Sequence, residues 1–336
     1  MNGAEGKSRQ LELVAAIRNV HEELRYKVQK DPDSYLKIWE EHNADPVRSK
    51  YASAMHSLAT EVWASKSAGG DRIEIIGNVI MNYFMGGGLQ KVFRRMHRKY
   101  SSISSAPEKV DRFGSFPENE LKVLDVGSCY NPFARFKFDV TAIDLCPATQ
   151  GVFQCDFINV PLGNEFVVSE NCIKCLPSNY FHAVIFSLLL EYLPDSRLRL
   201  SAVHRAYRVL RDDGILVVVT PDSKHQQKNQ DMVKSWRNAL SQLGFDRISY
   251  AKHDHLHCLA FRKLCRISRT IMSLKNLCEH SFDEMCECCT DRLSPMLFIH
   301  QDKLDYLSKF EPDPIRERSS EEQEHDALMF NELPGS

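Results

Sequence analysis

The chain has 336 residues, of which 43% are hydrophobic, and its formal net charge is −2. This length and apolar content suffice for one large globular domain or two ordinary ones. The near-neutral charge provides no global positive field toward nucleic acid or an anionic membrane, so any RNA contact requires a local patch. The polar start and the lack of an 18-residue apolar run predict neither a signal peptide nor a spanning helix. We therefore expect a cytoplasmic or nuclear protein whose eleven cysteines are reduced.

The first hundred residues are predicted to be helical. Residues 8–100 are expected to be helical because apolar residues recur at spacings of three and four between 13 and 28 and again between 73 and 84, which is the period of an amphipathic helix. Breaks at Asp31-Pro32, Asp45-Pro46 and Ala68-Gly69-Gly70 divide this region into about four helices. A linker rich in Ser and Pro, residues 101–118, follows it.

Residues 119–264 alternate short apolar strands with helices, which predicts an α/β, Rossmann-like domain with a mainly parallel sheet. A crossover helix is expected at 195–211 with Asp195 as its N-cap, and another at 231–243. Only a few residues around 252–256 separate the last two strands, too few for a crossover, so these strands should form an antiparallel hairpin. Residues 265–336 are expected to be a partly disordered tail, dispensable for ligand binding.

Polar residues or a glycine follow three successive strands of the predicted sheet. Gly127 comes directly after the first strand, Asp144 ends the second, and Asp156 follows the third. In a doubly wound sheet these positions meet at the carboxyl ends of the strands, where nucleoside ligands bind. Gly127 permits a tight turn close to a ligand, and Asp144 follows at nearly the ~20-residue spacing of a ribose-binding acid. Either acid alone is explained as well by a turn or cap, but together with Gly127 they favour a binding site.

Two further positions complete the predicted pocket. Phe157 is placed to cover the face of an adenine ring whose amino group donates to Asp156. Ser187 ends the fourth strand beside the pocket, although a buried strand terminus explains the apolar run around it equally well. The full G-x-G-x-x-G motif is absent, which argues against a dinucleotide, because its pyrophosphate needs the later glycines.

The order of these motifs resembles that of class I methyltransferases that use S-adenosylmethionine (SAM). The resemblance covers about residues 10–264 and rests on VLDVGS, AID, QCDF, FHAVIFSLLLEYLP and LRDDGILVVVTPD. With TPDSKHQ, KSWRNALSQLGF and HLHCLAFRK, it is similar to the family that joins a yeast ribosomal RNA adenine methyltransferase to the animal SAM sensors. The resemblance implies that Gly127, Asp144, Asp156, Phe157 and Ser187 contact SAM, and that S-adenosylhomocysteine also binds.

The resemblance also concerns the helical region and the partners. It implies that the N-terminal helices close over the ligand and present a basic residue such as Arg72 to the methionine carboxylate. An arginine near a helix start is also a common solvated surface residue. In the animal sensors of this family, the ligand-free form associates with the GATOR and KICSTOR complexes that restrain the target-of-rapamycin kinase. The chain is then expected in the cytoplasm, recruited to the lysosome surface through these partners.

Three other clusters have simpler explanations than a binding site. A basic run at 91–99 fits RNA phosphates or an acidic partner, but it is also an ordinary solvated helix face. Three alternating histidines would imitate metal ligands if they shared a strand, but no fourth ligand accompanies them: His253, His255 and His257. The cysteines at 172, 175, 286, 288 and 289 lack the paired spacing of a zinc site and are expected to be free thiols, so no metal is predicted.

The remaining question is whether the pocket serves catalysis or sensing. Methyl transfer from SAM needs mainly positioning of the acceptor, so a missing general base does not exclude an enzyme. Enzymes that methylate exocyclic amines carry Asn or Asp followed by Pro-Pro after the fourth strand, whereas this chain continues from Ser187 with Leu-Leu-Leu-Glu-Tyr. We therefore predict a SAM sensor. The alternatives are a SAM-dependent adenine methyltransferase acting on RNA, and a scaffold that binds no ligand.

Overall fold

The computed structural model describes residues 3–44, 47–58, 72–100, 121–223, 226–253, 255–265 and 285–310. Its centre is a sheet with the strand order β4-β6-β3-β2-β1-β7-β8-β10-β9. Strands β1 (Lys122–Val126), β2 (Asp139–Asp144), β7 (Phe181–Ser187) and β8 (Leu210–Pro221) pair in parallel. This arrangement confirms the predicted α/β, Rossmann-like fold.

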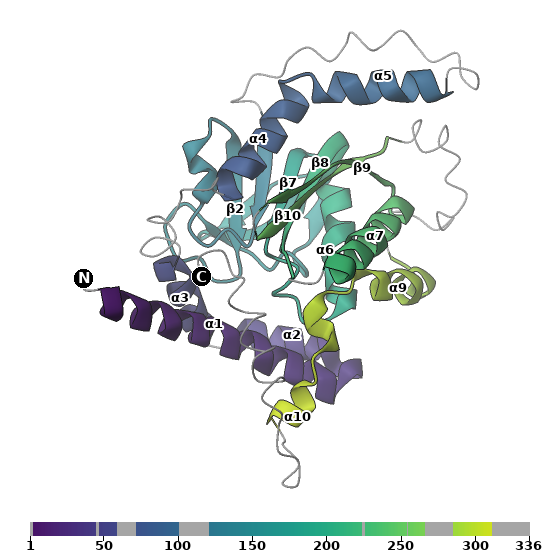
Figure 1. Ribbon diagram of the computed structural model, residues 1–336. Helices are drawn as coiled ribbons and strands as arrows, with labels where there is room; N and C mark the ends of the chain where they lie inside the picture. The colour runs from purple at the N-terminus through teal and green to yellow at the C-terminus, as the bar shows by residue number, and fades with distance from the viewer. Residues whose placement is uncertain are drawn as a thin grey trace.

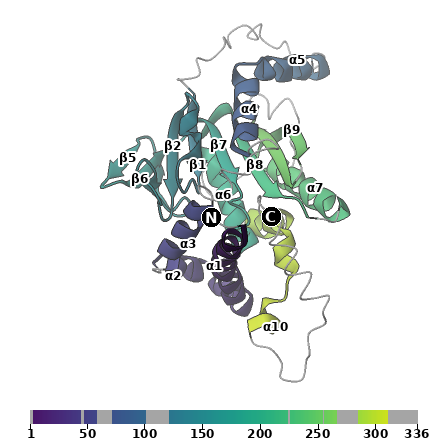
Figure 2. The same ribbon diagram turned by 60° about the vertical axis from the view of Figure 1, so that its left-hand side comes forward.

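The sheet ends in the antiparallel hairpin that the short connection predicted. Strand β10 (Leu256–Lys263) lies between β8 and β9 (Phe245–His253) and runs antiparallel to both. At the other edge lie strands that the sequence analysis did not predict: β4 (Leu162–Gly163), β5 (Val167–Ser169) and β6 (Cys172–Pro177). They are joined to the core of the sheet through β3 (Phe153–Gln154), and Figure 2 shows β5 and β6 at the margin of the molecule.

Helices α6 (Ser196–Val209) and α7 (Gln226–Gln242) cover one face of the sheet. The Asp195 side chain caps α6 as predicted, because it accepts a hydrogen bond from the Arg197 backbone N–H. The helix ends at Val209, two residues before the expected end at 211, and β8 begins immediately after it.

The other face is covered by α4 (Arg72–Phe84) and α5 (Gly88–Tyr100). Ile76 and Ile80 of α4 are fully buried in one cluster with sheet residues such as Val123 and Val217. Gly86 and Gly87 lie between α4 and α5, and Gly88 begins α5; this glycine break was not predicted from the sequence.

The first three helices do not cover the same part of the sheet as α4 and α5. Helices α1 (Gly3–Lys30), α2 (Tyr35–Ala44) and α3 (Val47–Ser57) lie below the sheet in Figure 1, whereas α4 and α5 lie above it. Helices α4 and α5 pack against the sheet, and the closure of the N-terminal helices over a ligand stays a prediction. The linker at 101–118 lies outside the described residues, and the proposed domain boundaries stay predictions.

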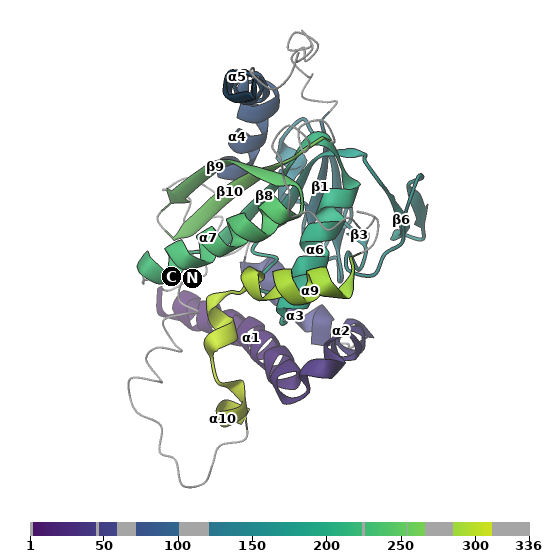
Figure 3. The same cartoon turned by 90° about the vertical axis from the view of Figure 1, so that its right-hand side faces the viewer.

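A folded segment follows the sheet where a tail was expected. Residues 285–310, here called the strap, contain α9 (Glu287–Leu293), two short 3-10 turns and α10 (Tyr306–Phe310). Leu293, Leu297 and Ile299 are buried in the main core, and the Trp236 indole N–H donates to the Phe298 carbonyl at 2.8 Å. Figure 3 shows α9 between the layer of α6 and α7 and helix α1. The sequence of the strap shows no regular hydrophobic periodicity, because its short helices and turns each bury only single side chains. For this reason the sequence did not predict the strap.

The far end of the strap is attached to α1. The Gln29 side chain donates to the Leu304 carbonyl and accepts from the Tyr306 backbone N–H, both at 2.8 Å, and Lys309 pairs with Glu22. The strap thus connects the helices on the sheet to the N-terminal helices. Within the described residues, no helix is long and apolar enough to span a bilayer.

Candidate functional site

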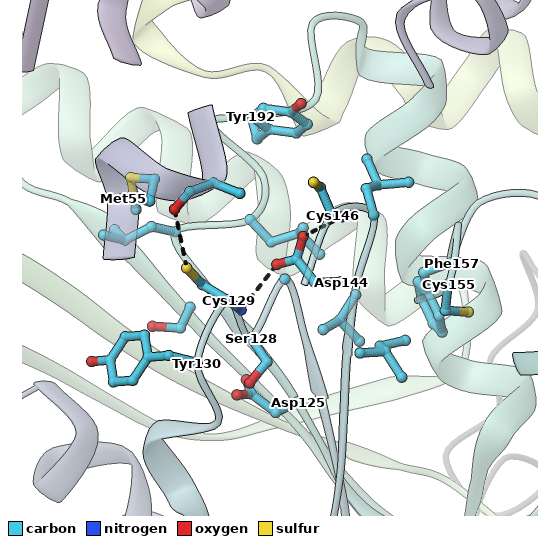
Figure 4. A pocket seen from close by; sticks show the side chains of 18 of the residues that line it. Met55, Asp125, Ser128, Cys129, Tyr130, Asp144, Cys146, Cys155, Phe157 and Tyr192 are labelled. Carbon is cyan, nitrogen blue, oxygen red and sulfur yellow. Dashed lines mark hydrogen bonds between the residues drawn. The ribbon is translucent and has the colours of Figure 1, made fainter. Parts of the chain in front are cut away.

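A pocket lies at the carboxyl ends of β1, β2 and β7, where α3 approaches the sheet (Figure 4). Its cavity of about 130 Å³ is roughly ten times the ~10–15 Å³ that a single water molecule needs. All six residues that the sequence analysis selected line this one pocket: Arg72, Gly127, Asp144, Asp156, Phe157 and Ser187. The structure thus brings the predicted residues together, and their contact with SAM stays a prediction.

Gly127 forms the turn that the sequence analysis expected. Its φ is +75°, a backbone conformation that residues other than glycine rarely adopt. A Cβ atom at this position would lie 3.2 Å from the Leu189 side chain. The Gly127 and Ser128 backbone N–H groups both donate to the Ile143 carbonyl, at 2.9 and 3.0 Å. The end of β1 is thereby tied to the end of β2 and positions Asp144 beside it.

Asp144 is held by the backbone of two loops. Its Oδ2 accepts from the Cys129 N–H and its Oδ1 from the Cys146 N–H, each at 2.9 Å (Figure 4). Burial raises the pKa of Asp144, and these hydrogen bonds act in the opposite direction. Each oxygen keeps a further lone pair, so the carboxylate can still accept from a pair of ribose hydroxyls.

Asp156 is linked to an N-terminal helix. Its Oδ2 accepts from the Asn43 side chain of α2 at 2.6 Å and from Asn159 at 2.9 Å, while its Oδ1 accepts from the Ile158 N–H at 2.9 Å. The neighbouring Phe157 ring is buried and packs edge-on against Phe186. An adenine amino group at Asp156 would therefore lie directly beside α2.

Ser187 ends β7 and lines the pocket as expected. Its Oγ is buried and has no hydrogen-bond partner among the described residues. The following residue, Leu188, has a φ of +63°, which turns the chain sharply along the pocket wall. A buried hydroxyl without a partner is costly, so a polar ligand group here would be stabilising.

Asp125 is a pocket residue that the sequence analysis missed. It lies within β1, is 2% exposed, and its Oδ2 has no hydrogen-bond partner in the described part of the chain. Burial raises the pKa of this carboxyl to about 7, and the positive charge of Arg72 opposes that rise. The signal was present in the sequence, since an acidic residue inside the apolar run Val-Leu-Asp-Val is unusual for a buried strand.

Aromatic and histidine side chains from α1–α3 and from the loop after β7 pack together over the pocket; we call Tyr51, Tyr192, His21, His42 and Trp39 the roof, and Tyr51, Tyr192 and Trp39 line the pocket directly. The Tyr192 ring, from the loop after β7, lies 5.1 Å from that of Tyr51 and 5.9 Å from that of Trp39. The His42 ring nitrogen and the Tyr192 hydroxyl are 2.5 Å apart. Burial lowers the pKa of His21 to about 3, which keeps this histidine neutral at physiological pH.

The other clusters do not join this site. Arg94 and Arg98 of the basic run are exposed on α5, on the opposite side of the sheet from α1. His253 lies in β9 and His257 in β10, so the two do not share a strand. His257 bonds to Asp222 and to the Tyr250 hydroxyl, each at 3.0 Å.

The chain resembles proteins of known name over nearly its full length. It is 34% identical to the "S-adenosylmethionine sensor upstream of mTORC1" of Xenopus laevis, over 98% of this chain and 85% of the relative. The protein of the same name from Danio rerio is also 34% identical, over 98% and 86%. The chain belongs to this family. A family model described as 25S rRNA (adenine(2142)-N(1))-methyltransferase, Bmt2, matches residues 91–281, which agrees with the relationship expected from the motifs.

Solved structures resemble the central part of the chain. One is a 1,6-didemethyltoxoflavin-N1-methyltransferase from Burkholderia thailandensis, 15% identical, covering 54% of this chain and 89% of that chain with a TM-score of 0.32. Another is a TehB-like SAM-dependent methyltransferase from Corynebacterium glutamicum, 14% identical, covering 52% and 97% with a TM-score of 0.32. The fold assignment for the family member described here follows from its own strand order.

Proposed function

We propose that this chain is a SAM-binding sensor that regulates target-of-rapamycin signalling. The observation that carries the proposal is the pocket itself, in which acidic residues from the ends of neighbouring strands lie under a roof supplied by α1–α3. The names of its relatives support the same function.

The charges of the pocket match the two ends of SAM. In this proposal Asp144 accepts hydrogen bonds from the ribose hydroxyls, Asp156 accepts from the adenine amino group, and Phe157 covers the adenine ring; all three residues line the pocket, which supports these roles. Asp125 and Arg72 also line the pocket. We expect the Asp125 carboxylate to pair with the ammonium of the methionine group and the Arg72 guanidinium to pair with its carboxylate. S-adenosylhomocysteine shares all these groups, so we expect it to bind as well.

The groups around the pocket favour sensing over catalysis. Glu191 does not line the pocket but bonds to the Thr220 hydroxyl at 2.5 Å, and Tyr192 bonds to His42 within the roof. Glu191 is therefore held outside the pocket, and Tyr192, which lines the pocket, already has its hydroxyl paired with His42.

We further propose that the ligand acts through partner proteins of the GATOR and KICSTOR type, at the lysosome surface. In this model the partners prefer the form in which α1–α3 are open, and SAM stabilises the closed form. A ligand shifts such an equilibrium only by its difference in affinity for the two forms. Asn43 on Asp156 provides such a difference, because it couples α2 directly to the ligand site.

A second candidate is a SAM-dependent adenine methyltransferase acting on RNA. The specific support is the match of residues 91–281 to a ribosomal RNA methyltransferase family model, together with the exposed basic side chains of α5. An adenine ring nitrogen is itself nucleophilic and needs little besides placement.

One experiment separates the two candidates. The purified chain is incubated with methyl-labelled SAM and total cellular RNA or extract, while calorimetry measures SAM binding. The sensor should bind SAM and transfer no label. Transfer to RNA that is lost in Gly127→Asp would identify the enzyme, and absence of binding would contradict both candidates.

A further inference from the structure

Three cysteines at the start of α9 bring their sulfur atoms together; we call Cys286, Cys288 and Cys289 the thiol cluster. Their Sγ atoms all lie within 4.8 Å of one another, and those of Cys286 and Cys288 are 2.9 Å apart. None of the three lines the SAM pocket. On this geometry we propose that the thiol cluster binds one Zn²⁺ ion, independently of the proposed SAM site.

The backbone of the cluster is fixed before any metal arrives. The Cys286 carbonyl accepts hydrogen bonds from the backbone N–H groups of Cys289 and Thr290, at 3.1 and 3.0 Å, and from the Thr290 hydroxyl at 3.2 Å. This turn places residues 286 and 289 at the N-cap and third positions of α9, whose side chains face one another. Metal binding therefore requires rotation of side chains and no rearrangement of the chain.

The distances between the sulfur atoms of the cluster are close to those between the sulfur ligands of a zinc ion. Zinc binds sulfur at about 2.3 Å in tetrahedral geometry, which separates two sulfur ligands by about 3.8 Å. The Cys286 and Cys288 sulfurs are 2.9 Å apart and no pair in the cluster is more than 4.8 Å apart, so only small side-chain adjustments, for which the exposed Cys288 has room, are needed to reach the zinc geometry. Water fills the fourth position, as in zinc sites with three protein ligands.

The surroundings fit a thiophilic metal. Thiolates select zinc or copper(I) over magnesium and calcium, which prefer oxygen. The Arg292 guanidinium lies 3.8 Å from the Cys289 sulfur and offsets the net negative charge of three thiolates around a divalent ion. This proposal replaces the sequence-based expectation of free thiols, which considered spacing along the chain and missed the helix turn.

Because of the position of the thiol cluster, a bound metal would stabilise the strap. Cys289 is 7% exposed and belongs to the main core, and Leu293, one turn further along α9, is 1% exposed. A metal bound at 286–289 would fix the beginning of the strap, which reaches α1 at its other end. Zinc should therefore raise the thermal midpoint of the protein, since it binds the folded strap alone.

The test uses the full chain, purified under reducing conditions without metal and titrated with Co²⁺ as a spectroscopic substitute for Zn²⁺. One equivalent should give a thiolate-to-metal charge-transfer band and intense d–d bands of tetrahedral cobalt, and Zn²⁺ should displace it. Cys288→Ser changes an exposed side chain and should weaken metal binding at least tenfold without unfolding the protein. Cys172→Ser, a cysteine in β6 outside the cluster, is the matched control and should bind metal like the unmodified chain.

Several results would overturn the proposal. They are the absence of charge transfer at one equivalent, equal metal affinity in Cys288→Ser and Cys172→Ser, or mass spectrometry that finds Cys286 and Cys288 joined as a disulfide in the reduced preparation. Calorimetric SAM titration of Cys288→Ser keeps the two proposals apart, because the variant should lose zinc and retain SAM binding.

Discussion

At the scale of single residues, Asp144 is the acid whose role is easiest to isolate. Asp144→Ala should weaken SAM binding by roughly ten- to a hundredfold, because a charge-assisted contact is worth about 1.5–3 kcal/mol. The structure adds a cost in stability, since the Cys129 and Cys146 N–H groups lose their acceptor. Calorimetry measures the SAM affinity, and thermal unfolding measures the stability. Asp139→Ala, an exposed acid at the start of β2, is the control, and equal SAM affinity in both variants would remove Asp144 from the site.

Asp125 predicts how SAM affinity depends on pH. The ammonium of SAM should bind the ionised carboxylate, and burial raises the pKa of Asp125 to about 7 in the ligand-free protein. As the pH falls from 7 to 6, the ionised fraction drops from about one half to about one eleventh, so affinity should fall about fivefold. The ligand's amino group remains protonated throughout this range.

The control for this prediction is Asp125→Asn. The variant should bind SAM more weakly at pH 7 and lose the pH dependence. If its affinity still falls fivefold between pH 7 and 6, the titrating group is not Asp125.

At the scale of elements, the strap should be needed for stability. Leu297 is fully buried among α6, α7 and α9, so Leu297→Ala should cost about 2–5 kcal/mol of unfolding free energy. Leu307→Ala, which truncates an exposed leucine of α10, should cost far less. Chemical denaturation measures both, and equal stability would show that the strap does not pack as described.

A truncation tests the same element against the earlier expectation. From the sequence, residues 265–336 are expected to be dispensable for ligand binding, yet the strap buries core residues and holds α1. A chain ending at 264 should therefore unfold at lower temperature and bind SAM more weakly, whereas a chain ending at 310 should retain both properties. Unchanged SAM binding in the shorter chain would restore the original expectation.

The sequence predicted those elements whose signals are local. Gly127, Asp144 and Asp156 were found because strand ends of a parallel sheet meet at one edge, and the final hairpin because its connection is short. The contacts of Asn43 and Tyr51 were not predictable, because they depend on how separate helices pack. Strands β4 and β5, of two and three residues, are too short to show periodicity, and the strap contributes single buried side chains.

At the scale of the whole molecule, closure of α1–α3 should depend on pH. Burial lowers the pKa of His21 to about 3, so the closed form binds fewer protons than the open form. Its stabilising contribution is fully present above pH 6.5 and is lost as the pH falls toward 3. Proteolysis within α1–α3 should therefore accelerate between pH 7 and pH 5, and His21→Gln should reduce this acceleration. Equal acceleration in the variant would assign it to another group.

In the proposed mechanism SAM binds in the pocket and holds α1–α3 closed over it, and amide hydrogen exchange with and without SAM measures this closure. If the closed form alone binds, SAM at ten times its dissociation constant stabilises that form by RT ln 11, about 1.4 kcal/mol. Exchange in residues 35–58 should then slow about elevenfold, while residues 76–84 of α4, already packed on the sheet, should change little. Gly127→Asp, which fills the pocket, should abolish the slowing. Equal exchange in residues 35–58 with and without saturating SAM would contradict the account.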